Sequence, residues 1–160
     1  MKTGFFLTFK SLHGFSKVFD ENNVQPELEV YDVTMLNNVA YLLNNGFLKR
    51  PIYVQFVLGI LAGIPPREDN VLFLLNKAKE LLGDFTWWVC APGRDQFDMC
   101  TLSLLLVGTV RVGLEDNLYL QKGLRAKSNA EQIEKIIGIA REPGLEPDSP
   151  DKAREIRKLK

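Results

Sequence analysis

The stretch that decides the fold is YVQFVLGILAGIPPREDNVLFLLNKAKELLGDFTWWVC, which runs from Tyr53 to Cys90. It opens with an apolar run at Tyr53–Leu58 and closes with a second one at Thr86–Cys90. Between them, Asn70–Leu82 carries apolar residues at helical spacing and stops at Gly83, a residue type that commonly ends helices. Nearly continuous apolar runs are typical of parallel strands that are covered on both faces. The stretch therefore predicts a strand, a helix and a second strand, the unit that links neighbouring parallel strands.

The same alternation continues on both sides of this unit. Two further strands are predicted at Leu28–Tyr31 and at Thr109–Gly113. Further helices are predicted at Met35–Asn44, at Gln96–Val107, from Ser128, where Glu131 could bind the Ser128 amide in a capping box, and after Ser149-Pro150. Four strands that alternate with helices predict an α/β fold with a parallel sheet.

The length and the net charge of the chain narrow the possible folds and binding partners. The chain has 160 residues and a net charge of zero, with 20 lysines and arginines against 20 aspartates and glutamates. This balance gives no electrostatic case for binding nucleic acid or an anionic membrane. The length predicts one domain, yet a complete (β/α)₈ barrel needs ~250 residues. The chain has no glycine-rich dinucleotide or phosphate loop. We therefore expect residues 1–160 to form one partial domain, half of a (β/α)₈ barrel, which needs a second half or a second copy to cover its sheet edges.

The rare residues predict no metal or disulfide framework. Cys90 and Cys100 match no zinc or disulfide spacing, and they predict two reduced, buried thiols in a cytosolic protein. The alternative is a nucleophilic pair of a cysteine with His13, the only histidine. No apolar run approaches the ~18 residues of a membrane span, and polar residues interrupt the amino terminus too often for a signal peptide. We expect a cytoplasmic location.

The most informative polar residues follow the last predicted strand. Arg111 lies within that strand, and Glu115-Asp116-Asn117 follows it closely. Charged groups at a buried strand end need a partner or a ligand, because burying an unpaired charge is costly. Arg111 can pair with Asp116 and hold it ionised or orient it as a base, and Glu115 could bind a metal. The alternative is a surface turn in which Asp116 or Asn117 caps a helix.

Polar residues also mark two other predicted strands. Glu27 and Glu29 alternate onto one face of their strand, either toward the barrel interior or on the solvated face of an edge strand. Arg94 follows the strand that contains Trp87-Trp88, and it either binds an anion beside a helix amino terminus or faces solvent. We expect the two tryptophans to belong to the core.

These segments together resemble the beta-keto acid cleavage enzyme family, one member of which acts in lysine fermentation. The segments that carry the resemblance are Pro26–Asp32, Phe56–Gly59, Pro92–Gln96 and Arg111–Tyr119, with weaker likeness at 122–123, 126–130 and 153–156. Residues 25–160 resemble the carboxyl-terminal half of the family, whereas residues 1–24 match it poorly.

The resemblance implies a chemistry and a set of roles. Members are zinc-dependent (β/α)₈ barrels that convert a β-keto acid and acetyl-CoA into acetoacetate and a new CoA thioester. In that pattern Glu115 is a zinc ligand, and Arg111 and Asp116 lie at the substrate and assist its deprotonation. One glutamate of the first strand lies near the site, and we favour Glu29 over Glu27.

The family's histidine zinc ligands have no counterpart, because His13 cannot replace a His-x-His motif. Three functions follow as hypotheses. The chain belongs to a cleavage enzyme whose other half is supplied separately, with Arg94 as the candidate for binding the acetyl-CoA cofactor. Alternatively, it is an inactive, truncated remnant. The third hypothesis is a non-enzymatic α/β domain in which Arg94 and Arg111 hold an anion or a partner.

Overall fold

The centre of the fold is a four-stranded parallel sheet in the computed structural model, which describes residues 8–157. The strands lie in chain order, so that each one pairs with the next, and they comprise β1 (Glu27–Val30), β2 (Tyr53–Val57), β3 (Thr86–Cys90) and β4 (Thr109–Val110). The predicted parallel sheet is confirmed. β4 is shorter than the predicted Thr109–Gly113, because the chain leaves the sheet where Arg111 turns into the following loop.

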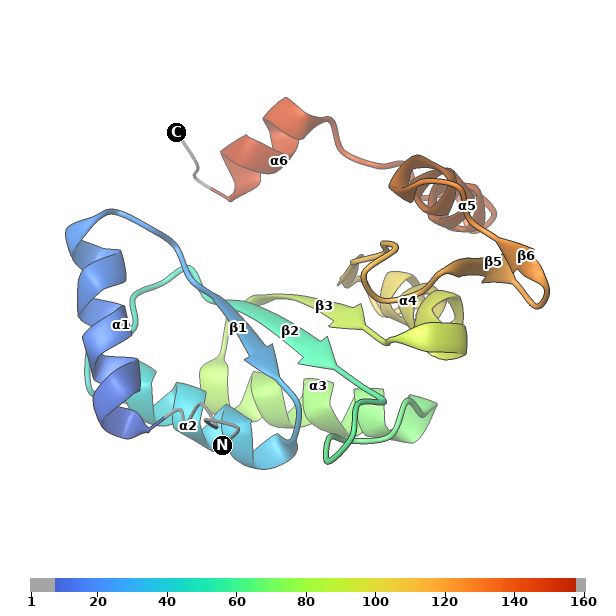
Figure 1. The fold of residues 1–160 in the computed structure, drawn as a ribbon. Helices are drawn as coiled ribbons and strands as arrows, with labels where there is room; N and C mark the ends of the chain where they lie inside the picture. The colour runs from blue at the N-terminus through green and yellow to red at the C-terminus, as the bar shows by residue number, and fades with distance from the viewer. Residues whose placement is uncertain (1–7, 158–160) are drawn as a thin grey trace, which may run out of the picture.

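Helices follow each strand, as expected for half of an eight-stranded barrel. Their bounds are α2 (Val33–Asn44), α3 (Glu68–Leu82), α4 (Gln96–Leu105), α5 (Asn129–Arg141) and α6 (Pro150–Ile156). Figure 1 shows α2 and α3 along one face of the sheet, which we call the outer face. Val54, Phe56, Trp87 and Val89 point to this face and form the main core with residues of α2 and α3. α4 and α5 pack on each other in a smaller cluster around Phe97, Cys100 and Ile136.

The predicted helix ends are confirmed where a local signal marks them. The Ser128 hydroxyl accepts a hydrogen bond from the Glu131 amide at 3.3 Å, and Ser149 caps α6 in the same way. The Glu131 side chain differs from the prediction. It accepts from the amide of Lys127 at 2.7 Å rather than from that of Ser128.

Two elements were not predicted. The first is α1 (Phe9–Glu21), which Thr8 caps by accepting a hydrogen bond from the Ser11 amide at 3.2 Å. The second is a hairpin of β5 (Tyr119–Gln121) and β6 (Leu124–Arg125), inserted between β4 and α5. In addition, a short 3₁₀ helix, η1 (Gly93–Asp95), precedes α4. Residues 1–7 of the predicted amino-terminal segment lie outside the described residues.

The inner face of the sheet, opposite α2 and α3, carries the polar residues. Alternation along β2 sends Gln55 to this face, where it lies in register with Glu29 on β1 and with Trp88 on β3. The end of α6 covers the inner face, since the Arg157 guanidinium lies 4.9 Å from the Trp88 ring centroid and 5.6 Å from that of Tyr53. Among residues 8–157, no helix is both long and apolar enough to cross a membrane.

Candidate functional site

Arg111 is the centre of the candidate site, directly after β4. Its Nε lies 3.2 Å from Oδ2 of Asp116, and its Nη2 lies 2.9 Å from Oε2 of Glu115. Its Nη1 lies 3.6 Å from Oε1 of Glu29, which comes from β1 at the other edge of the sheet. The structure therefore brings together four of the residues predicted from the sequence, at the carboxyl ends of parallel strands, where barrel enzymes place their active sites.

The carboxylates around Arg111 differ in their exposure. The Asp116 side chain is 10% exposed, whereas that of Glu115 is 82% exposed. Oδ2 of Asp116 is buried and accepts no hydrogen bond, although Arg111 Nε is within ion-pair distance, because the N–H does not point along the line between the two atoms. Oδ2 thus lies beside a positive charge, and the Cys90 thiol lies near the same carboxylate, since a hydrogen bond to Asp116 is, after burial, among the causes that raise the pKa of Cys90. Asp116 does lie in a turn, as the alternative predicted, but its side chain is mostly buried and the following helix α5 is capped by Ser128 instead.

The guanidinium of Arg111 remains charged in this position. Burial lowers the pKa of Arg111, but the surrounding carboxylates, Asp116 first among them, raise that pKa by more than burial lowers it. One positive charge thus faces the three carboxylates of Glu29, Glu115 and Asp116, and the cluster carries a formal excess of negative charge.

The two glutamates of β1 have different partners. Glu29 accepts a hydrogen bond from the Tyr31 hydroxyl, and this bond together with burial raises the pKa of Tyr31 to about 12. Glu27 accepts a hydrogen bond from Nε2 of Gln55. Glu29 is therefore the glutamate that lies within ion-pair distance of Arg111, and Glu27 reaches Arg111 only through Gln55, which accepts from Nη1 at 3.2 Å. Both side chains are also partly solvated, as the edge-strand alternative predicted.

Buried glutamines that the sequence analysis missed hold the site loop in place. Gln96 accepts from the Gly113 amide at 3.4 Å and donates to Gln132 at 2.8 Å. Gln132 in turn donates to the backbone oxygen of Asn117. Gln55, Gln96 and Gln132 are all fully buried. The only signal in the sequence was a polar residue within an apolar run, as in Tyr53–Leu58.

Arg94 is not part of the Arg111 cluster. Its side chain is 94% exposed, and its nearest charged partner is its neighbour Asp95 at 3.5 Å. The residue nevertheless lies on η1, which contacts the site loop, since the Gly93 amide donates to the backbone oxygen of Asp116 at 2.8 Å. The structure thus places Arg94 on a solvated rim, and its cofactor role stays a prediction.

The cysteines are free and buried, as predicted. Burial raises the pKa of Cys90 to about 12, and the nearby Asp116 carboxylate adds to the shift. Burial likewise raises the pKa of Cys100 to about 12. His13 lies in α1 and stacks on Phe47, with 3.7 Å between the ring centroids. The described residues therefore show no Cys/His pair, and a neutral thiol is a poor nucleophile.

The described residues do not by themselves fit a zinc site. Within residues 8–157, no group of three or more histidine, cysteine, aspartate or glutamate side chains is arranged to hold a metal ion. The Glu115 carboxylate is paired with Arg111, and His13 belongs to a different part of the fold. The role of Glu115 as a zinc ligand stays a prediction from the family resemblance.

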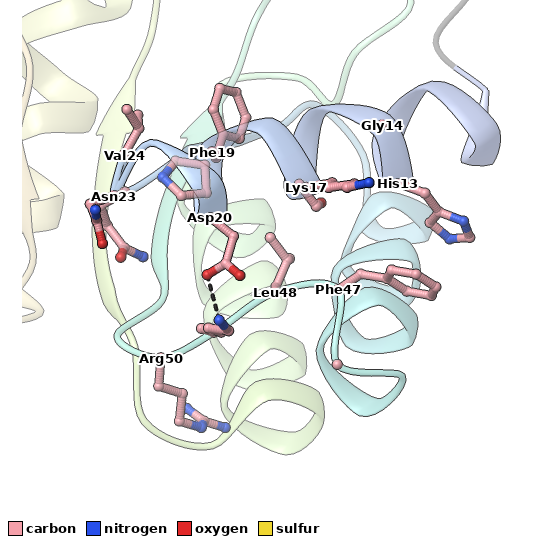
Figure 2. Close-up of a pocket in the computed structure, with 15 residues that line it drawn as sticks. His13, Gly14, Lys17, Phe19, Asp20, Asn23, Val24, Phe47, Leu48 and Arg50 are labelled. Carbon is pink, nitrogen blue, oxygen red and sulfur yellow. Dashed lines mark hydrogen bonds and ion pairs between the residues drawn. The ribbon is translucent and has the colours of Figure 1, made fainter.

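Among the cavities of the described residues, one lies at the amino ends of the strands and another on the inner face of the sheet. The larger, of about 730 Å³, is shown in Figure 2 between α1 and the chain that leads into β2, where Lys49 pairs with Asp20. It lies at the amino ends of the strands, since Gln25 and Arg50, which line it, directly precede β1 and β2. The smaller, of about 450 Å³, is lined by Arg111 together with residues of the inner face, α5 and the end of α6. Only the smaller cavity borders the candidate site.

Comparison with known proteins adds three kinds of likeness. The family model for beta-keto acid cleavage enzyme matches residues 2–159, and so includes most of the amino-terminal segment. The 3-keto-5-aminohexanoate cleavage enzymes of Fusobacterium nucleatum and Acetoanaerobium sticklandii are each 38% identical to this chain. The alignments cover 96% and 89% of the chain, but 54% and 51% of those proteins. A 3,5-dioxohexanoate:acetyl-CoA acetone transferase of Paraburkholderia graminis is 34% identical, over 87% of the chain and 45% of that protein.

The fold is also found in solved structures. ObcA, in a ternary complex with a C4-CoA adduct and oxalate, superposes with a TM-score of 0.79 at 16% identity, over 95% of this chain and 41% of that one. The chain therefore spans about half the length of the curated relatives it matches, in agreement with a half barrel. By the match over nearly its whole length, this chain belongs to the beta-keto acid cleavage enzyme family.

Proposed function

We propose that the chain supplies the proton-abstracting part of a beta-keto acid cleavage enzyme, which uses acetyl-CoA to convert a β-keto acid into acetoacetate and a new CoA thioester. Asp116 is the base, Arg111 forms an ion pair with it, and Glu29 completes the charged cluster. The observation that carries the proposal is the buried Oδ2 of Asp116, which lies 3.2 Å from Arg111 Nε and accepts no hydrogen bond.

The proposed step is removal of a proton from the carbon between the ketone and the carboxylate of the substrate. The proton moves to Asp116 Oδ2, and the electron pair of the broken C–H bond becomes an enolate. An aspartate can act as a base only while it is ionised. The cavity that Arg111 lines offers space for a substrate beside the guanidinium. Asp116 does not line this cavity, so the proposed step requires the substrate to reach the buried Oδ2 past Arg111.

Zinc belongs to this proposal only through the family resemblance. Bound zinc would polarise the keto group as a Lewis acid. The described residues do not form its site, so we derive no step through the metal. Glu115 is the proposed ligand from this chain, and further ligands would come from the part of the relatives that this chain does not match.

The two edges of the sheet indicate the proposed partner. β1 and β4 each pair on one side only among the described strands, so both edges of the sheet offer free backbone groups. We infer that a complementary half barrel, on another chain or another segment, covers these edges. Arg94 is the proposed contact for acetyl-CoA, and the cytoplasm is the proposed location.

Complementation tests the proposal directly. The chain is produced together with the segment of the Fusobacterium nucleatum enzyme that it does not match, and acetoacetate is measured after adding 3-keto-5-aminohexanoate and acetyl-CoA. We expect acetoacetate that depends on both polypeptides and on acetyl-CoA, and its loss in Asp116→Asn. Undiminished turnover in Asp116→Asn would sink the assignment of the base.

The hypothesis that Arg94 and Arg111 together hold an anion lacks a joint site, because Arg94 is exposed and is not part of the Arg111 cluster. If the chain is an inactive remnant instead, no complementing segment will restore turnover, although the fold remains intact.

A further inference from the structure

Gln55 is a polar residue that the proposed mechanism does not use, and it is fully buried on the inner face of β2. Its Oε1 accepts a hydrogen bond from Nη1 of Arg111 at 3.2 Å, and its Nε2 donates to Oε1 of Glu27. The amide thus bridges a carboxylate on β1 and a guanidinium that follows β4. A buried amide inside an apolar strand lowers stability unless its hydrogen bonds are made.

The two partners fix the orientation of the amide. A carboxylate accepts hydrogen bonds only, and a guanidinium donates only. If the amide of Gln55 were turned over, its NH₂ group would face Arg111 and its oxygen would face Glu27, so that both contacts would be repulsive. Glu27 therefore forces the oxygen of Gln55 toward Arg111.

The contact is made at the one edge of the guanidinium that lacks a close carboxylate. Nη2 is held by Glu115 at 2.9 Å and Nε lies 3.2 Å from Asp116, whereas the carboxylate nearest to Nη1 is that of Glu29 at 3.6 Å. Glu115 is mostly exposed, so its bond to Arg111 competes with water. The buried oxygen of Gln55 is thus the contact that best restricts rotation of the guanidinium plane.

The geometry points to Gln55 as a positioning residue, which fixes the guanidinium plane of Arg111 so that Nε faces Asp116, with Glu27 acting through Gln55. The importance of this role for turnover rests on the proposed function. The contact between Gln55 and Arg111 can be measured without turnover. A failure of the positioning role is therefore distinguishable from a failure of the proposed function.

The test follows the Arg111 side chain by ¹⁵N NMR in the full chain, where the signals absent from Arg111→Lys identify it. A held guanidinium shows separate Nη1 and Nη2 signals, because rotation about the Nε–Cζ bond is slow. We expect this rotation to be about tenfold faster in Gln55→Met, which removes one hydrogen bond to a charged group while keeping the shape of the side chain. Glu27→Gln, a mild change at an exposed side chain, should accelerate it less, since the Gln55 amide is then free to turn over.

Gln25→Met is the matched control. The side chain of Gln25 also donates one partly buried hydrogen bond, to the backbone oxygen of Pro51 at 2.6 Å. Gln25 precedes β1, however, and lies away from Arg111. This control should leave the rotation unchanged. If Gln55 has only a structural role, Gln55→Met will lower the midpoint of urea unfolding but will not change the rotation of the Arg111 guanidinium in the folded protein. Unchanged rotation in Gln55→Met overturns the inference, and if that variant does not fold, unchanged rotation in Glu27→Gln does the same.

Discussion

Nε of Arg111 lies 3.2 Å from Oδ2 of Asp116, and that oxygen is buried and accepts no hydrogen bond. The pair is close in sequence, yet it is completed by Glu29 and Gln55 from two other strands. A buried carboxylate oxygen next to a guanidinium is the feature on which the proposed role of Asp116 as a general base rests.

The first prediction concerns this pair in the complemented enzyme. Asp116→Asn keeps the volume of the side chain but removes the base, and it should lower acetoacetate formation by at least about 100-fold. Arg111→Lys keeps the positive charge but loses the planar, multi-point contact, and it should lower turnover less than Asp116→Asn does. Arg141→Lys changes another ion-paired arginine, whose partner is Glu146 at 3.1 Å, and should have no effect. Equal losses in Arg111→Lys and Arg141→Lys would contradict the role of the pair.

The second prediction concerns metal. Because residues 8–157 offer no group of three metal-binding side chains, the purified chain alone should hold far less than one zinc per molecule after dialysis. Elemental analysis of the dialysed protein measures this content. Stoichiometric zinc that is lost in Glu115→Gln would show that this chain builds the metal site without a partner.

The third prediction concerns stability at high pH. In the folded protein, burial raises the pKa of Cys100 from its ordinary value of 9.0 to about 12. Between these values the unfolded thiol loses its proton and the folded thiol keeps it, so the free energy of unfolding must fall as pH rises from 9 to 12. The slope is about 1.4 kcal/mol per pH unit for each such thiol.

Urea unfolding at several pH values measures this slope in the wild type and in Cys100→Ala. The variant should lose less stability than the wild type above pH 9, and the two should differ by a constant amount below that pH. Parallel curves over the whole range would mean that Cys100 does not have the assigned shift.

The fourth prediction concerns packing at Gly108, which precedes β4. A Cβ atom there would clash with the Ser103 hydroxyl and would lie 2.7 Å from the Trp87 ring, and Trp87 is buried. Gly108→Ala should therefore lower the free energy of unfolding by about 1–3 kcal/mol, as overpacking does. Gly138→Ala in α5, where a Cβ would meet nothing within 4 Å, should instead raise it by about 0.5–1 kcal/mol. Urea unfolding of both variants checks the contrast, and a tolerated Gly108→Ala would show that the contact relaxes freely.

Elements with a local signal could be predicted from the sequence. β3 begins and ends where its apolar run does, and α5 and α6 begin after the serines that cap them. The amino-terminal helix α1 was missed although a signal was present, since Thr8 and Ser11 cap it reciprocally. None of its described residues is buried, whereas α3 contributes five buried residues to the core, so α1 has little tertiary packing to mark it.

The candidate site was predictable only in part. Arg111, Glu115 and Asp116 stand within six positions, and their likeness to the family marked them as a group. No local pattern identified Gln55, Gln96 or Gln132 as part of the site. Each of these glutamines acts through hydrogen bonds to residues that are distant in the sequence. Gln55 and Arg111, for example, are separated by 56 positions.

The sequence by itself determined the alternation of strands and helices, the ends of most elements and the charged group after β4. These features depend on interactions within a few residues, such as capping, apolar spacing and turn formation. The family resemblance favoured Glu29 over Glu27, and the structure has Glu29 within ion-pair distance of Arg111. The tertiary structure alone decided that Arg94 remains on the rim and that Gln55 lies between Glu27 and Arg111. Those contacts depend on the register of β1, β2 and β4 in the sheet, which is set by packing of the whole core.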